Sequence, residues 1–448
     1  MRHHRAMTAT LAAAALTLTA CGGGASSVAS SAAPLEATLI TRVAPEGLTV
    51  VAVALEYDRV LSLAPDGAQP SDFAVEVEFD AAGEEALSGV RTVTAVRTGA
   101  VPDAEGAPAD GRYVILELEA SEPTAAASYV DWSTTITHGY ALEEGYSISQ
   151  VGDLESSDGH VVAASDAAVP VADVTHEVVD DFTSATFASD AGPALPYRAL
   201  TPETPAPTDG YPLVVTLHGY GDSGDDNLGQ LTGNQIATAF ADEARQRTGP
   251  AYVLSPQADP SDPAKGAWWD PSMQDAVVEL IEDFIASHPD VDASRVYLTG
   301  LSMGSYGSWA ILEDHADLFA GAVLVCGGGI ADVAAAAAAL TEVPIWAVHS
   351  EDDAVVAYDA EGSDLRAFQA FQAAGTPVVW SAWDGLLPDA RQESLARDAV
   401  AQAERTGSTH LFTTIEADTT PGFNHQSWIP TYANDVILDW LLAQDRDG

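Results

Sequence analysis

The feature that most constrains the fold of this chain is a change of hydrophobic periodicity near residue 185. Beyond that point, short apolar runs bounded by glycine alternate with helical segments. Alternation of this kind is typical of a parallel sheet covered by helices on both faces. The sequence therefore predicts an α/β domain over 185–448. We expect strands at 212–217, 251–255, 295–299, 320–326, 343–348 and 377–383, and helices at 274–287, 303–313, 331–340 and 432–444.

The segment 36–184 has a different pattern, with a period of two. Its clearest stretch is 73–79, where Phe and Val alternate with Ala and Glu, and Asp80 follows. Such alternation indicates a half-buried strand, and short strands separated by turn-rich pieces indicate a sandwich. We predict an all-β, immunoglobulin-like domain here, with further strands at 48–57, 90–97, 113–119 and 146–151.

The N-terminus has the layout of a secretory signal. Arg2 and Arg5 precede a 15-residue stretch without charge, which is too short to span a bilayer as a helix. The stretch ends in Leu-Thr-Ala-Cys21, which resembles the lipobox of bacterial lipoproteins. We predict a signal peptide over 1–20, lipidation of Cys21 and a flexible tether over 21–35, and hence a protein anchored to the outer face of the bacterial cell membrane. An ordinary secretory signal cleaved nearby is the alternative.

The net charge excludes some partners. The chain carries 67 acidic and 17 basic residues, a formal charge of −50. Nucleic acids and anionic membrane surfaces both require a basic footprint, so we expect no nucleic-acid partner and membrane contact only through the lipid anchor. Removing the signal would leave 15 basic against 67 acidic residues, or −52. Cys326 would then have no intramolecular partner, and its apolar surroundings indicate a buried strand residue rather than a catalytic thiol.

The strongest local signal for chemistry is the G-x-S-x-G sequence from Gly300 to Gly304. It follows an apolar strand and precedes a helical segment. A strained turn between strand and helix exposes the serine oxygen and requires small residues two positions before and after it. The pattern predicts Ser302 as a nucleophile.

A serine nucleophile needs a base and an acid that orients the base, and in this arrangement they follow in the order acid, then histidine. The strand 343–348 leads into three acids, Glu351, Asp352 and Asp353. We choose Asp353, because Val-Val follows one residue later and begins the next packed segment. Asp352 is the alternative.

Four histidines follow Ser302. His315 ends the helix after the turn, His349 stands beside the acids, and His410 begins an apolar strand. His425 lies in a loop before the last helix, where a flexible loop can bring an imidazole over the serine. We predict His425 as the general base.

Stabilising an oxyanion requires two backbone donors. We expect the amide of Met303, which follows the serine, and the amide of Tyr220, in the loop after the first strand; Gly221 is the alternative. The same loop, 219–224, also reads G-x-G-x-x-G, the pattern of dinucleotide binding. The dinucleotide motif requires an acid at the end of the strand that follows it. In this chain the following strand ends in Leu-Ser-Pro-Gln257, so no nucleotide is expected.

No motif indicates a metal or a cofactor. The chain has no H-E-x-x-H and no cysteine pair at zinc spacing, and the acid pairs 180–181 and 225–226 are typical of solvated or capping positions. The aromatic residues Trp268, Trp269, Tyr306 and Trp428 are expected either in an acyl pocket or in the core.

These motifs together resemble the α/β-hydrolase esterases of the phospholipase/carboxylesterase and "predicted peptidase" group. The resemblance is carried by 218–227, 255–257, 300–304, 326–329 and 424–428, and some members have an N-terminal immunoglobulin-like domain. It implies carboxylester hydrolysis. The chain departs from the pattern at Ser350, where glycine is usual, and in a polar helical insertion at 384–409.

The sequence thus predicts a serine carboxylesterase that uses Ser302, His425 and Asp353 without a cofactor. Its charge favours neutral over polyanionic esters, whether small or polymeric. A peptidase, a polyester hydrolase and a feruloyl-ester hydrolase are alternatives of the same fold. An alternative of another class is a non-catalytic surface lipoprotein whose β domain binds a partner.

Overall fold

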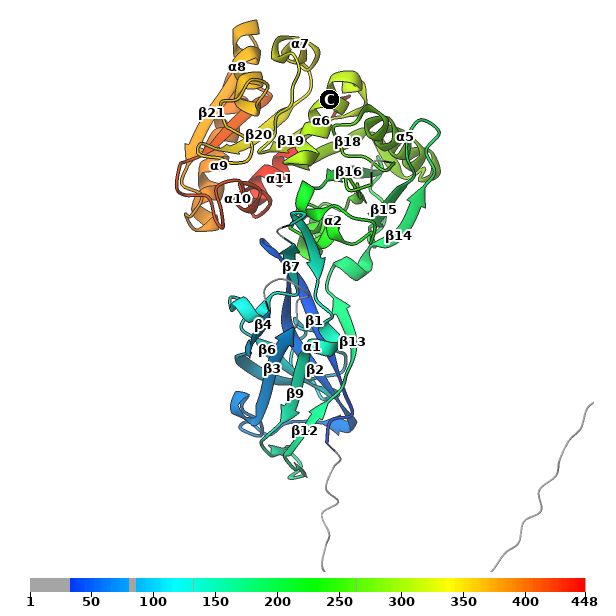
Figure 1. Ribbon diagram of the computed structural model, residues 1–448, viewed down its shortest axis with the longest axis vertical. Coiled ribbons are helices and arrows are strands. Elements are labelled where there is room, and N and C mark those ends of the chain that lie inside the picture. Colours follow the sequence, from blue (N-terminus) through cyan, green and yellow to red (C-terminus); the bar gives the residue numbers. More distant parts are fainter. Residues whose placement is uncertain (1–32, 80–85, 132, 263, 448) are drawn as a thin grey trace, which may run out of the picture.

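The structure is a computed structural model that describes residues 33–79, 86–131, 133–262 and 264–447. The predicted signal peptide, Cys21 and most of the predicted tether lie outside the described residues. Two domains follow one another along the long axis of the molecule (Figure 1). In the part of the chain that the structure describes, no helix is long and apolar enough to cross a membrane.

The N-terminal domain contains a five-stranded sheet in the order β13-β1-β2-β6-β5 and a four-stranded sheet in the order β12-β9-β3-β4. Two short pairs, β7-β8 and β10-β11, complete it, with the helix α1 (Leu142–Gly145). The strands are β1 (Glu36–Ala44), β2 (Gly47–Leu61), β3 (Phe73–Phe79), β4 (Leu87–Val90), β5 (Val93–Gly99), β6 (Gly111–Leu118), β7 (Ser128–Asp131), β8 (Ile136–Gly139), β9 (Tyr146–Gln150), β10 (Leu154–Glu155), β11 (Val161–Val162), β12 (Ser165–Val169) and β13 (Val171–His176).

One predicted strand of this domain begins too early: β5 accounts for residues 93–97 of the predicted strand 90–97. The segment 90–97 is not continuous: β4 ends at Val90 in one sheet and β5 begins at Val93 in the other. Arg91, at the crossing, is buried, and its guanidinium donates to the hydroxyl of Tyr146 and to the carbonyls of Val50 and Glu119. Its Nε also donates to the Glu122 carboxylate at 3.2 Å, so each nitrogen of the buried guanidinium has an acceptor.

The C-terminal domain is built on a nine-stranded sheet in the order β14-β15-β17-β16-β18-β19-β20-β22-β21. The first pairings, β14-β15 and β15-β17, are antiparallel and the others are parallel. The strands are β14 (Thr183–Phe187), β15 (Leu195–Leu200), β16 (Tyr211–Leu217), β17 (Tyr252–Pro256), β18 (Val291–Leu301), β19 (Gly321–Val325), β20 (Ile345–Ser350), β21 (Val378–Trp383) and β22 (His410–Ile415). β14 begins two residues before the expected boundary at 185. Its mostly exposed side chains give no apolar run from which to place it.

Alternate residues of the central strands face two separate layers of the core. Leu298 packs with helices α5 to α8, whereas the neighbouring Tyr297 packs with α9, α11 and the segment around α2 and α3. Both faces of the sheet are therefore covered, as the apolar strand pattern predicted. The helices are α2 (Gly229–Thr232), α3 (Thr238–Ala241), α4 (Glu243–Thr248), α5 (Pro271–Ser287), α6 (Met303–Asp314), α7 (Val333–Ala339), α8 (Asp364–Ala374), α9 (Asp389–Thr406), α10 (Trp428–Tyr432) and α11 (Asp435–Leu442).

Two helical expectations need adjustment. The helix expected at 432–444 is the shorter α11, which Asn434 caps by accepting a hydrogen bond from the Val436 amide at 3.2 Å, and a separate short helix, α10, precedes it. The insertion at 384–409 contains α9, which packs against β21 and α11 through a buried alanine face. The insertion is thus part of the layered core.

The two domains share a continuous apolar interior. Buried side chains of the β domain and of the layer around α2 and α3 belong to one cluster. The β7-β8 hairpin reaches the loop after β16: a Cβ placed on Gly221 would lie 3.5 Å from the Thr135 carbonyl oxygen. The side-chain amide of Gln235 donates to the Val43 carbonyl at 3.2 Å. The β domain therefore touches the loop in which the sequence places an oxyanion donor.

Candidate active site

The structure brings Ser302, Asp353 and His425 together at the carboxyl edge of the sheet. They follow β18, β20 and β22, which are parallel, so the three loops open on the same side. The Nε2 atom of His425 lies 2.9 Å from the Ser302 Oγ, and its Nδ1 lies 2.7 Å from the Asp353 Oδ2. A carboxylate can only accept, so Nδ1 carries the proton and Nε2 is the atom that accepts from the serine hydroxyl. This arrangement can transfer a proton away from Ser302.

Ser302 occupies a strained turn, with φ 51° and ψ −118°. Its amide donates to the Val325 carbonyl at 2.9 Å, which ties the turn to the next strand. A Cβ on Gly300 would lie 2.4 Å from the Gly304 carbonyl oxygen, and a Cβ on Gly304 would lie 1.8 Å from the Leu217 carbonyl oxygen. Neither position has room for a side chain, so both glycines are needed for the turn.

The two neighbouring acids have different surroundings. Asp353 is buried; its Oδ1 accepts the amides of Val355 and Val356, and its Oδ2 faces His425. Asp352 turns the other way, and its Oδ2 accepts the Asp418 amide at 3.1 Å. Only Asp353 is within hydrogen-bonding distance of His425.

A second histidine, His349, lies behind the acid. Its Nε2 is 3.4 Å from the Asp353 Oδ2, and its Nδ1 is 3.0 Å from the Asp364 Oδ2. Burial alone would raise the pKa of Asp353, but hydrogen bonds from His349 and His425 outweigh it and hold this pKa well below its usual range. Sequence reasoning rejected His349 as the base and found no other role for it. Its position four residues before Asp353 is the signal that could have linked the two.

The loop predicted to supply an oxyanion donor lies against the serine. A Cβ on Gly219 would be 3.9 Å from the Ser302 Cβ. Tyr220 opens a short 3-10 helix, Tyr220–Asp222, and Met303 opens α6. Amides at the first position of a helix have no acceptor within it, so both are available to an incoming oxyanion.

Two buried side chains fix this loop. The His218 Nε2 accepts the Ala258 amide at 2.9 Å, so its Nδ1 carries the proton and donates to the Gly219 carbonyl at 2.6 Å. Burial lowers the pKa of His218 to about 4, which keeps the ring neutral. Asp222 accepts the Gly219 amide and the side-chain amide of Asn234, and burial raises its pKa to about 7. Neither residue was singled out from the sequence for this task.

Cys326 follows β19 and is buried beside Asp353 and His425. It offers a sulfur within 4.8 Å of ligand atoms on Asp353 and His425. However, both ring nitrogens of His425 are already engaged, and burial raises the pKa of the thiol well above its ordinary value. A protonated thiol and an occupied imidazole do not fit a metal site.

Aromatic side chains surround the serine. Tyr220 stacks on Trp269 at 6.4 Å between ring centroids, and Trp269 meets Tyr306 edge to face at 6.3 Å. The Trp428 ring lies edge to face at 5.3 Å from that of His425. Trp268, by contrast, is a core residue whose indole N–H donates to the His218 carbonyl. The sequence did not distinguish the core residue Trp268 from the exposed Trp269.

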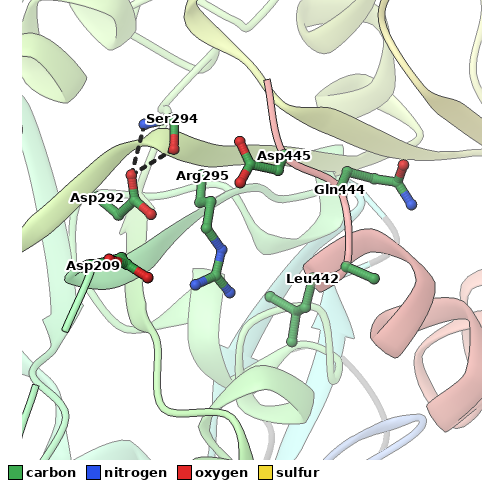
Figure 2. Close-up of a pocket in the computed structure, with 8 residues that line it drawn as sticks. Asp209, Asp292, Ser294, Arg295, Leu442, Gln444 and Asp445 are labelled. Carbon is green, nitrogen blue, oxygen red and sulfur yellow. Dashed lines mark hydrogen bonds between the residues drawn. The ribbon is translucent and has the colours of Figure 1, made fainter. Parts of the chain in front are cut away.

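A separate pocket lies at the amino end of β18 (Figure 2). In it the Asp292 carboxylate accepts the amide and the hydroxyl of Ser294. None of its lining residues is a histidine or cysteine, and it lies at the edge of the sheet opposite Ser302. Its lining residues are Asp209, Asp292, Ser294, Arg295, Leu442, Ala443, Gln444 and Asp445.

The fold and the residues at this edge of the sheet define an α/β hydrolase of the esterase type, preceded by an immunoglobulin-like domain. Comparison with known proteins agrees: residues 36–163 match the family model for the esterase Ig-like N-terminal domain. The solved structure of a thermostable esterase superposes with a TM-score of 0.71 and 29% identity, covering 92% of this chain and 100% of that one.

Two curated relatives match parts of the chain. "Putative esterase NocK" of Nocardia uniformis subsp. tsuyamanensis is 27% identical over 42% of this chain and 52% of its own length. Poly(3-hydroxyalkanoate) depolymerase C of Paucimonas lemoignei is 29% identical over 26% of this chain and 28% of its own length. The chain thus spans about half or less of the curated relatives it matches.

Proposed function

We propose that this protein is a serine esterase that hydrolyses neutral carboxylic esters. The observation that carries the proposal is the chain of contacts from Ser302 through His425 to Asp353, at 2.9 and 2.7 Å, on a strained turn. The similarity to esterases over both domains supports the same reaction class.

The reaction proceeds in two halves. His425 takes the hydroxyl proton as the Ser302 oxygen attacks the ester carbonyl, and the amides of Met303 and Tyr220 stabilise the resulting oxyanion. Collapse of this intermediate breaks the ester bond, and the leaving alkoxide takes the proton from His425. Water, deprotonated by His425, then releases the acid from Ser302. Asp353 holds the imidazole in the tautomer that both halves require.

The rim of the site favours an ester with a bulky apolar part. Trp269 and Phe423 are both 48% exposed and Val355 is 61% exposed, although each lies next to a residue of the site. Exposed apolar side chains gathered at a catalytic centre are typical of a binding surface. An apolar polyester is therefore a second candidate, which the local similarity to a poly(3-hydroxyalkanoate) depolymerase also supports.

The substrate class is tested with the purified protein on a matched panel. Initial rates are compared for p-nitrophenyl acetate, p-nitrophenyl octanoate, a feruloyl ester, a poly(3-hydroxybutyrate) film and an aminoacyl-peptide, each with Ser302→Ala as the blank. We expect hydrolysis of the neutral esters. Cleavage of the peptide alone would refute the esterase proposal, and no turnover of any substrate would favour a binding role.

We further propose that the protein is exported and held at the outer face of the cell membrane by a lipid on Cys21. The lipobox-like sequence supports this, and the acidic surface suits an exported soluble domain. The test is incorporation of an alkynyl fatty acid in cells. Label on the wild-type chain that is lost in Cys21→Ser is expected, whereas an unlabelled, freely secreted wild-type protein would contradict lipidation.

A further inference from the structure

The structure contains a second buried histidine next to the triad acid, with its own carboxylate partner. His349 and Asp364 are both fully buried. His349 is the last residue but one of β20 and Asp364 is the first residue of α8, so the pair joins two elements through residues that are 15 positions apart in the chain. The catalytic mechanism proposed above makes no use of either residue.

Two of the three hydrogen-bond partners of the Asp364 carboxylate can only donate. Its Oδ1 accepts the indole N–H of Trp309 at 2.7 Å, and its Oδ2 accepts the Gly327 amide at 2.7 Å as well as facing His349 at 3.0 Å. Each carboxylate oxygen of Asp364 thus accepts a hydrogen bond from an N–H group. Asp364 is therefore an anion, and the His349 Nδ1 that faces it is a donor.

The other nitrogen of the ring also faces acceptors. The His349 Nε2 lies 3.0 Å from the Val356 carbonyl oxygen and 3.4 Å from the Asp353 Oδ2. Neither atom can donate, so Nε2 must carry a proton too. With protons on both nitrogens, the ring is an imidazolium held between two carboxylates. Burial would lower the pKa of His349, but the two aspartates outweigh it and raise this pKa to about 9.

The remaining titratable groups around His349 are Tyr358, Tyr306, Cys326 and the exposed Glu351. The Tyr358 ring meets the imidazole edge to face at 5.6 Å, and Glu351 lies beyond it on the exposed side. Tyr306, on α6, and Cys326, after β19, face the same carboxylates. Burial raises the pKa of all three hydroxyl and thiol groups, so they stay neutral at neutral pH.

We propose that His349 is a positioning residue that stays protonated at neutral pH and, with Asp364, forms a buried ion pair that holds the triad acid Asp353 in place and limits the basicity of His425. The inference rests on the proposed esterase function. The cation shares the Asp353 Oδ2 with His425, so it opposes protonation of His425 and keeps that base free at lower pH. If the His349 cation were absent, the Asp353 carboxylate would favour the protonated, inactive form of His425.

The direct test is NMR of wild-type protein labelled with 15N-histidine, with His349 assigned from the signals lost in His349→Gln. We expect two ring N–H signals for His349 that persist from pH 5 to 8. A single ring N–H, or a His349 signal that titrates between pH 6 and 7, would overturn the proposal. This readout does not depend on turnover, so it separates a failure of the inference from a failure of the esterase proposal.

The functional test is the pH profile of kcat/KM on p-nitrophenyl acetate. In His349→Gln we expect the acidic limb to move up by about one pH unit, because this variant removes a positive charge that shares the Asp353 Oδ2 with His425, at 3.4 and 2.7 Å from that oxygen. If this variant unfolds, His349→Gln/Asp364→Asn removes both charges and should shift the limb in the same direction by less. A limb that stays in place in folded variants would refute the coupling.

His410 provides the matched control. It is also a fully buried histidine on this sheet, but it begins β22 and lies at the opposite end of the strand from the site. Its partners are the Leu340 carbonyl and the Thr409 hydroxyl, and burial lowers its pKa to about 4. His410→Gln is expected to leave the acidic limb unchanged. An equal shift in this variant would mean that the effect comes from general loosening of the sheet, and would overturn the proposal.

Discussion

Exchange of the two adjacent acids, Asp353→Asn and Asp352→Asn, separates the role of a triad acid from that of a structural acid. In Asp353→Asn the Oδ1 contacts to the Val355 and Val356 amides are kept if the amide oxygen takes that place. The amide nitrogen then faces the Nδ1 of His425, 2.7 Å from the former oxygen. Two donors cannot pair, so the ring adopts the other tautomer, with the proton on Nε2.

This tautomer cannot accept the proton of Ser302. Loss of the correct tautomer in a Ser-His-Asp site costs about 10⁴ in kcat, which corresponds to about 5 kcal/mol of transition-state stabilisation. The Asp352 carboxylate does not face His425; it accepts a hydrogen bond from the Asp418 amide at 3.1 Å. An asparagine oxygen can accept that bond equally well, so kcat should change by less than about threefold.

The assay is kcat and KM on p-nitrophenyl acetate at pH 8, with thermal unfolding of both variants to establish that they are folded. Fluorophosphonate labelling gives an independent measure of the reactivity of Ser302. If Asp353→Asn kept more than a tenth of the wild-type kcat, or if Asp352→Asn lost as much as Asp353→Asn, the assignment of the acid would be wrong.

Three further outcomes follow from the structure. Gly304→Ala should destabilise the protein by about 3 kcal/mol or more and reduce turnover, because its Cβ would lie 1.8 Å from the Leu217 carbonyl oxygen; urea unfolding that matches wild type would contradict this. A chain that begins at Phe182 lacks the β domain and its contact with the Gly221 loop, so we expect a Tm lower by several degrees and a kcat lower by about tenfold. Unchanged values of Tm and kcat would mean that the β domain is only a spacer. The pKa of His349 is raised to about 9 from an ordinary 6.5, which adds about 3 kcal/mol to the free energy of unfolding; this contribution is fully present below pH 6.5 and is lost as the pH rises through 9. Urea unfolding at pH 6.5, 8 and 9.5 should show that loss in wild type and a flatter pH dependence in His349→Gln.

The sequence predicted the layered α/β domain because the central strands are apolar on both faces and alternate with helical segments. It also predicted that Ser302, Asp353 and His425 lie together at the edge of the sheet, because each of them follows a strand and the three occur in the expected order. The local pattern could not establish which of two adjacent acids faces the histidine, since Asp352 and Asp353 turn in opposite directions only in the folded loop.

Features that depend on distant residues were beyond sequence reasoning. The division of 90–97 between two sheets depends on a buried Arg91, whose partners come from several other strands. The ion pair of His349 depends on Asp364, which only the packing of α8 against β20 brings near. β14 has mostly exposed side chains and pairs with β15 along its backbone, so its sequence carries no periodic signal.

The most direct test of the account is the site of reaction with a fluorophosphonate. Intact-mass and peptide mass spectrometry of the folded wild-type protein should show one adduct on Ser302, formed at a rate that follows the acidic limb of the activity profile. Ser302→Ala should show neither adduct nor ester hydrolysis while keeping the wild-type Tm. An unlabelled Ser302 in active protein, or hydrolysis that persists in Ser302→Ala, would contradict the claim that this residue is the nucleophile.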